Sequence, residues 1–191
     1  MSAAARLFDA PLVGLYPVGI DEANALIAGR WQHDLGPCER PFGQQAFVLE
    51  VNGTPAAATI SASIVNGPVA GYERQQIVEL ARLAGEPWAT RMMIRLWREV
   101  CAPIWPYWPV EAAVSYSLNT KTGNLYRFDG WDRITSTAGS TGGGSWSTRR
   151  NPDDPRRGSK TLWCWRYPEG SSNSMSAKTV AAAVRKRDGA A

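Results

Sequence analysis

One stretch of the chain, from Ser115 to Trp131, limits the possible folds more than any other (SYSLNTKTGNLYRFDGW). It continues a β-prone segment, turns polar after Leu118, and then carries a short helical pattern that ends at Gly130. A strand that enters a helix through a polar turn places side chains and free backbone N–H groups at the carboxyl edge of a sheet. In open α/β sheets this edge is where ligands bind. We therefore expect the functional site here.

The spacing within this stretch resembles a known family. The matching positions are Asn119, Thr122, Leu125, Tyr126, Gly130 and Trp131. They follow the Asn-x-x-Ala-x-x-Leu-Tyr-x-x-x-Gly-Phe pattern that closes the acyl site of GNAT-type N-acyltransferases. Residues 77–83, followed by a helix, resemble the central strand and cofactor helix of that superfamily. The resemblance covers residues 15–167 and implies an α/β (α+β) fold, a single GNAT-like domain whose mixed, mostly antiparallel sheet of about six or seven strands is flanked by helices.

A second motif resembles one particular group within this superfamily. Residues 142–146 read GGGSW, and Lys160 and Leu162-Trp163 lie beyond them. This arrangement resembles a group of phage and bacterial GNAT-fold proteins that is similar in turn to Mom, a phage protein that modifies adenine in DNA. The resemblance implies an acyltransferase-like enzyme whose acceptor amine is the exocyclic nitrogen of a DNA base, acting in a bacterial or phage-infected cell.

Length and composition agree with one soluble domain. The chain has 191 residues, where one domain usually has about 100–200, and 44% of its residues are hydrophobic. We expect a loose leader over residues 1–14, the domain over 15–168 and a flexible basic tail over 169–191. Three cysteines indicate no disulfide framework. With no signal peptide and no apolar run of about 18 residues, we expect a cytoplasmic protein without membrane contact.

Periodicity and turn residues predict the elements of the domain. Asn52-Gly53 is the strongest hairpin signal, and Pro87 is suited to the first turn of a helix. We expect helices from a cap at Asp21 to residue 30 and over 87–102, with a short turn at 125–128. The expected strands are 15–18, 46–51, 56–63, 76–83, 112–118, 131–135 and 161–167.

Four residues around the expected sheet edge are candidates for catalysis. By resemblance, Tyr126 is the general acid that protonates a leaving thiolate, whereas the alternative is an interfacial tyrosine. Glu79 could deprotonate the amine if burial raised its pKa, or it could form an ion pair with Arg82 or Arg74. Asn119 could contact the cofactor or form an Asx turn. Ser115 could present its hydroxyl in the same opening.

His33, the only histidine, is a further candidate. It lies in the loop after the first helix, where the Mom-like group carries histidines, and Asp34 follows it. It could act as a base or a single metal ligand, or have a structural role. One histidine with Cys38 nearby does not make a metal site.

The acyl donor implied by the resemblance is acetyl-CoA or another acyl donor, held around the start of the second helix. The corresponding residues are Leu83, Pro87, Trp88, Ala89, Thr90, Arg91 and Met92. CoA-using members carry glycines here, whose backbone N–H groups close on the pyrophosphate at a helix N-terminus. This chain has bulkier residues, so the usual cradle is missing, although Arg91 could meet a phosphate.

Basic residues concentrate in the loop before the last strand, and DNA is the partner they suggest. The candidates are Trp146, Arg149, Arg150, Arg156, Arg157 and Lys160. Arginines beside glycines and an aromatic suit a nucleic-acid strand, although a solvated loop explains them equally well. Two alternative functions remain open at this point. One is a conventional acetyl-CoA-dependent N-acetyltransferase of a small molecule or protein, and the other is a non-catalytic nucleic-acid-binding module.

Overall fold

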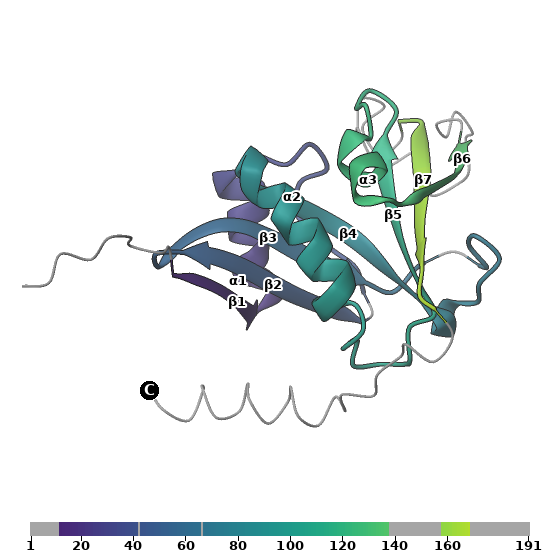
Figure 1. The fold of residues 1–191 in the computed structure, drawn as a ribbon, viewed down its shortest axis with the longest axis horizontal. Helices are drawn as coiled ribbons and strands as arrows, with labels where there is room; N and C mark the ends of the chain where they lie inside the picture. Colours follow the sequence, from purple (N-terminus) through teal and green to yellow (C-terminus); the bar gives the residue numbers. More distant parts are fainter. Residues whose placement is uncertain (1–11, 42, 66, 138–157, 169–191) are drawn as a thin grey trace, which may run out of the picture.

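A seven-stranded mixed sheet forms the centre of the computed structural model, which describes residues 12–41, 43–65, 67–137 and 158–168 (Figure 1). The strands lie in the order β1-β2-β3-β4-β5-β7-β6. Their bounds are β1 Val13–Val18, β2 Gln44–Val51, β3 Thr54–Ala62, β4 Ile77–Gly85, β5 Ala112–Leu118, β6 Asp132–Thr137 and β7 Lys160–Arg166. The predicted α/β fold with a mixed, mostly antiparallel sheet is confirmed.

Only one pair of neighbouring strands in this sheet, β4 and β5, runs parallel. The other five pairs are antiparallel. The predicted Asn52-Gly53 hairpin joins β2 to β3, and both turn residues have positive φ (52° and 75°). A parallel pair needs a crossover connection, which here is the segment containing the second helix.

Each of the two longer helical segments begins as an α-helix and continues as a π-helix. The first is α1 Ile20–Asn24, continued by a π-helix Ala25–Arg30. The second is α2 Pro87–Leu96, continued by a π-helical turn Trp97–Cys101. Pro87 occupies the first turn as predicted, since its missing N–H costs nothing there. The expected cap at Asp21 is wrong, because Gly19 is the N-cap and Asp21 lies in the first turn.

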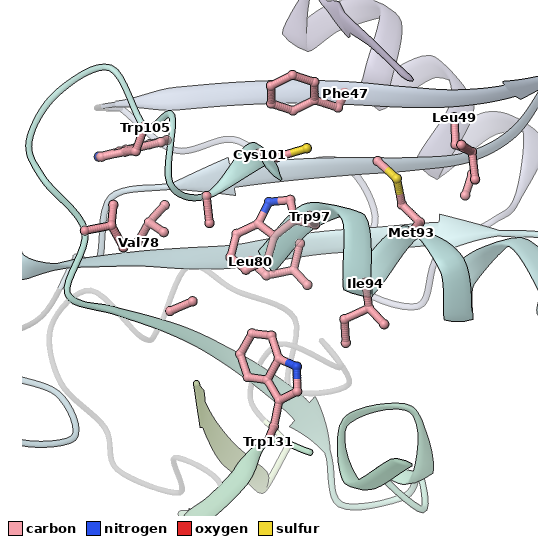
Figure 2. Close-up of a cluster of buried hydrophobic side chains, with 14 of the residues drawn as sticks. Phe47, Leu49, Val78, Leu80, Met93, Ile94, Trp97, Cys101, Trp105 and Trp131 are labelled. Carbon is pink, nitrogen blue, oxygen red and sulfur yellow. The ribbon is translucent and has the colours of Figure 1, made fainter. Parts of the chain in front are cut away.

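Helices cover both faces of the sheet (Figure 1). On one face, α2 packs with α3 (Asn124–Asp129) over a core in which Trp97 is fully buried. In Figure 2, Trp97 lies beside Leu80, while Met93 extends toward Leu49 and Ile94 toward Trp131. On the other face, α1 and the π-helix that continues it pack on β2 and β3 through Ala23 and Ile27.

One carboxylate ties α3 to α2. Asp129, at the end of α3, accepts hydrogen bonds from Arg98 Nε at 2.7 Å and Trp131 Nε1 at 3.0 Å. Arg95 of α2 approaches the same carboxylate at 3.4 Å. Trp131 then stacks against Trp97, with ring centroids 6.2 Å apart. The position of α3 over β5 is therefore fixed by buried charge and aromatic packing together.

Several boundaries differ by one or two residues from those expected. β1 begins at Val13, inside the expected leader, because it pairs with β2 from Val13↔Val51 onward. β4 extends to Gly85, and β6 begins at Asp132. The expected tail lies outside the described residues. Within the described part of the chain, no helix is both long enough and apolar enough to span a membrane.

Candidate active site at the opening between β4 and β5

The two parallel strands pair at one end and separate at the other. Pairing extends only from Ile77↔Ala112 to Leu80↔Ser115, whereas β4 continues to Gly85 and β5 to Leu118. Figure 1 shows the two strands diverging from a common end. A register shift against β3 gives β4 an extra residue just beyond Leu80, where the divergence begins. Such bulges re-aim a strand beside functional sites.

Tyr126 lies at the point of divergence. Its hydroxyl is 2.9 Å from Ser115 Oγ, and Ser115 Oγ donates to the backbone oxygen of Leu80 at 2.9 Å. Because the single serine proton goes to Leu80, the Tyr126 hydroxyl donates to Ser115. Burial raises the pKa of the Tyr126 phenol, and the hydrogen bond with Ser115 partly opposes that rise. The phenol therefore keeps its proton at neutral pH, as a general acid must.

Two tryptophans hold the Tyr126 ring in this position. The Trp163 ring stacks on it with centroids 5.4 Å apart and an interplanar angle of 12°. The Trp131 ring meets it edge-on at 5.5 Å. Trp163 is itself fixed by donating from Nε1 to Ser117 Oγ at 2.9 Å. The phenol therefore has little freedom to leave the opening.

Glu79 forms an ion pair, but with a partner that the sequence did not indicate. Arg40 Nη2 donates to both carboxylate oxygens, at 2.9 and 3.0 Å. Of the expected partners, Arg74 donates to Val65 O. Arg82 donates to backbone oxygens, Ala81 O among them, and its charge lowers the pKa of Glu79. Glu79 is 5% exposed, and burial raises its pKa although the Arg40 guanidinium opposes the rise. Its charge also contributes to the raised pKa of Tyr126.

His33 borders the same opening. Together with Tyr116 and Tyr126 it lines a pocket of about 250 Å³, which we call the Tyr126 pocket. Its Nδ1 accepts a hydrogen bond from Leu35 N at 3.1 Å, so the neutral ring carries its proton on Nε2. Burial and the nearby Arg82 guanidinium lower its pKa to about 4. His33 is therefore neutral at physiological pH, with its one N–H donor at Nε2.

Asn119 does not form the expected Asx turn. Its Oδ1 accepts a hydrogen bond from Thr161 Oγ1 of β7 at 2.8 Å. The turn after β5 is closed instead by backbone, with Lys121 N donating to Leu118 O at 2.9 Å. Asn119 therefore fixes the end of β5 to β7 rather than shaping its own turn.

The junction between β4 and α2 does not fit a pyrophosphate. One residue, Glu86, separates Gly85 from Pro87, and its N–H is already donated to Ala56 O at 2.8 Å. Pro87 has no N–H, and Thr90 N donates to Glu86 O. Only two residues in the first turn, Trp88 and Ala89, keep unengaged N–H groups, and the Glu86 carboxylate adds negative charge.

Of the other residues expected to bind the cofactor, some are buried in the core and others are exposed on the surface of α2. Ala89 is buried in the core between α2 and the sheet, and Leu83 packs against that core. Trp88 and Met92 are 52% and 40% exposed. Arg91 is exposed, and Thr90 bonds to Pro87 O. These side chains flank α2 and do not converge on one point.

Most of the predicted nucleic-acid residues lie outside the described part of the chain: Trp146, Arg149, Arg150, Arg156 and Arg157. Lys160 is described, and it opens β7 in register with Leu118. Among the described residues, no group of three or more histidine, cysteine or acidic side chains could hold a metal ion. All three cysteines are free and buried.

Sequence reasoning missed the residues that position the loop carrying His33. The Arg82 guanidinium donates to backbone oxygens of Leu35, Gly36 and Pro37, which fixes this loop on β4. Lys121, in the turn after β5, reaches across to Asp34 at 2.8 Å. Arg82 lies inside a strand that is apolar except for Glu79, and such an arginine is the one signal in the sequence that could have indicated this contact.

Solved structures with this arrangement share one fold. The ribosomal-protein-S18-alanine N-acetyltransferase of Escherichia coli matches with a TM-score of 0.54 and 12% identity, covering 83% of this chain and 98% of that one. A probable acetyltransferase (GNAT family) of Chromobacterium violaceum matches with a TM-score of 0.52 and 12% identity, covering 81% of this chain and 87% of that one. The chain has the GNAT fold. A Bacillus subtilis acetyltransferase in complex with CoA matches with a TM-score of 0.51 and 10% identity, covering 83% of this chain and 100% of that one.

These likenesses concern the fold, since every identity is low. No protein-family model and no curated protein matches the sequence. The opening between β4 and β5, with Tyr126 at its apex, is thus the feature on which a functional argument about this GNAT fold depends.

Proposed function

We propose that the chain is an N-acyltransferase that moves an acyl group from an activated donor to an amine in the Tyr126 pocket. The observation that carries the proposal is the protonated Tyr126 hydroxyl at the apex of the β4–β5 opening, held by Ser115. Burial keeps the phenol protonated through its raised pKa, as an acid for a leaving group requires. The GNAT fold supports the same reaction class.

In the proposed reaction, the amine nitrogen attacks the acyl carbon and forms the new C–N bond. The bond from the acyl carbon to its leaving atom breaks, and that atom takes the proton from Tyr126 Oη. Ser115 can then turn its hydroxyl proton from Leu80 O to the phenolate oxygen, because Ser115 Oγ lies 2.9 Å from both. The surplus proton on the nitrogen passes to a base, and the base returns a proton to Tyr126 through solvent.

Glu79 is the better candidate for that base. Burial raises the pKa of its carboxyl, which makes the carboxylate more basic than usual. His33 has a pKa of about 4, and its only lone pair already accepts from Leu35 N. Replacing Glu79 with Gln should lower the acyl-transfer rate more than replacing His33 with Gln.

The donor is recognised chiefly at its acyl end under this proposal. The β4–α2 junction offers two unengaged N–H groups beside a carboxylate, so a CoA pyrophosphate gains little there. A short thioester should therefore be used nearly as well as acetyl-CoA. A kcat/KM for acetyl-CoA that exceeds that for S-acetyl-N-acetylcysteamine by several orders of magnitude would contradict this part.

A DNA base is a more specific candidate for the acceptor. The GGGSW resemblance suggests it, and the cationic side chains near the end of β5 favour an anionic acceptor. Mass spectrometry of nucleosides from cells that express the protein tests this candidate. A new mass on one nucleoside, absent with Tyr126→Phe, is the expected result.

The reaction class itself is tested with purified protein. Thiol release from a short thioester is measured with a panel of amines, for wild type and Tyr126→Phe. Loss of the general acid should lower the rate by about 10²–10⁴-fold. Tyr107→Phe, at a tyrosine 54% exposed in the 103–109 connection, is the matched control and should keep its rate. Equal rates for all three proteins would refute the assignment.

A further inference from the structure

A second, larger cavity lies beside the Tyr126 pocket. It has a volume of about 720 Å³ and lies where the end of β5, α3 and the β6–β7 pair meet. We call it the basic pocket and define it by Asn119, Lys121, Arg127, Arg133, Thr161 and Trp163. Pockets of about 300–1,000 Å³ hold small-molecule ligands, so this volume is enough for a nucleotide-sized molecule.

Among the described residues, the charged side chains that line the basic pocket are all cationic. Lys121 is paired with Asp34, which lies outside this pocket. Arg127 has no hydrogen-bond or ion-pair partner within the described part of the chain. Among the same described residues, the one partner of Arg133 is Ser136 Oγ, to which it donates at 2.8 Å. No carboxylate is among the described residues that line it. Within the described residues, two guanidinium groups of this pocket are therefore not neutralised by a carboxylate.

A chain of hydrogen bonds also orients Asn119 to donate. Arg133 donates to Ser136 Oγ, whose oxygen lies 3.3 Å from Thr161 Oγ1. Thr161 gives its single proton to Asn119 Oδ1 at 2.8 Å, so its oxygen accepts from Ser136. With Oδ1 engaged, the Asn119 side chain presents its two Nδ2 protons outward. The basic pocket thus offers donors from a neutral side chain as well as from the arginines.

The basic pocket adjoins the proposed acid. Trp163, on its wall, is the ring stacked on Tyr126. Three residues, Ser117, Lys121 and Thr122, line both this cavity and the Tyr126 pocket. A ligand with one end in the basic pocket can therefore place its other end near the Tyr126 hydroxyl without crossing the sheet.

We propose that the basic pocket binds the phosphate group of a phosphorylated substrate whose reactive end lies in the Tyr126 pocket, an inference that rests on the proposed acyl transfer. The planar donors of a guanidinium group match the oxygens of a phosphate, and a phosphate monoester carries about 1.5–2 negative charges at neutral pH. The β4–α2 junction is the poorer site for this group, because it offers only two unengaged N–H groups and the Glu86 carboxylate stands beside them.

Isothermal titration calorimetry on the purified protein tests the proposal with adenosine 5′-monophosphate, inorganic phosphate, adenosine and citrate. The two phosphates should bind saturably, and adenosine should bind at least about tenfold more weakly than its phosphate. Arg127→Gln should weaken phosphate binding about tenfold or more. Asn119→Asp, which replaces donors with a charge of the wrong sign, should weaken it further.

Arg74→Gln is the matched control, since it removes the same charge from an exposed arginine that donates to Val65 O. Its affinity should equal that of wild type. Tyr126→Phe should bind phosphate normally even where acyl transfer is lost, so failure of the two proposals can be told apart. The proposal is overturned if folded wild type binds neither phosphate, if citrate alone binds, or if Arg127→Gln and Arg74→Gln behave alike.

Discussion

Replacing Gly123 with Ala should destabilise the protein through the aromatic stack that holds Tyr126. Gly123 precedes α3 with a φ of +67°, a left-handed conformation that disfavours any residue with a Cβ. A Cβ built at this position would lie 2.4 Å from Cζ2 of the Trp163 ring. Trp163 cannot move freely, because it stacks on Tyr126 and donates to Ser117.

The expected magnitude has two parts. The left-handed backbone costs about 1–2 kcal/mol for a residue other than glycine. Forcing an extra methyl group into a packed aromatic wall costs a further ~1–3 kcal/mol. The free energy of unfolding should therefore fall by about 2–5 kcal/mol, a large share of the stability of a typical domain, about 5–15 kcal/mol.

Gly53→Ala separates the two parts. Gly53 has a similar φ of +75°, but a Cβ there would meet nothing within 4 Å. Urea unfolding of the two variants should show that Gly123→Ala loses about 1–3 kcal/mol more than Gly53→Ala. Equal losses would show that Trp163 yields without cost, and the argument that it holds Tyr126 rigidly would then be wrong.

Three further predictions follow from buried polar contacts. Arg40→Met should raise the pKa of Glu79 further, because Arg40 opposes the rise caused by burial. Above about pH 4.5 the unfolded chain loses the Glu79 proton more readily than the folded variant does, so the variant should become less stable relative to wild type as pH rises. Urea unfolding of both proteins at several pH values measures this difference in stability. A difference that does not change with pH would contradict the prediction. Ser115→Ala removes the hydrogen bond that lowers the pKa of Tyr126. In the pH profile of acyl transfer, the fall in rate at alkaline pH should therefore move to higher pH, and the rate at lower pH should be smaller than in wild type. If the alkaline fall stays at the same pH, Tyr126 is not the acid. Trp97→Phe should cost about 1–3 kcal/mol in thermal unfolding, since Nε1 of this fully buried residue donates to Ser61 Oγ at 2.8 Å; an unchanged Tm would contradict it.

Periodicity and turn chemistry were enough to predict most of the sheet. Asn52-Gly53 marked a hairpin because both residues adopt positive φ readily, and Pro87 marked a helix start because it needs no N–H there. The prediction of a helix cap at Asp21 was wrong because the extended backbone that follows β1 ends at Gly19, two residues earlier, and the helix begins there. Local preference among neighbouring residues cannot decide which of them begins a helix when tertiary packing sets the register.

The contacts that build the candidate site were less predictable. Tyr126 could be selected from its spacing, but its bond to Ser115 depends on the register of β5 against β4. The Arg40–Glu79 pair joins residues 39 positions apart, through a loop that has no periodic pattern. Long-range pairings of this kind depend on the closed fold, so neither residue alone indicates the other.

The central claim, acyl transfer that depends on Tyr126, is tested most directly in cells. Nucleosides and small amines from cells that express wild type or Tyr126→Phe, at equal levels of folded protein, are compared by mass spectrometry after feeding labelled acetate. The account predicts a labelled N-acyl product that is abundant with wild type and lost, or reduced at least about 10²-fold, with Tyr126→Phe. The same product at the same level with both proteins would contradict it.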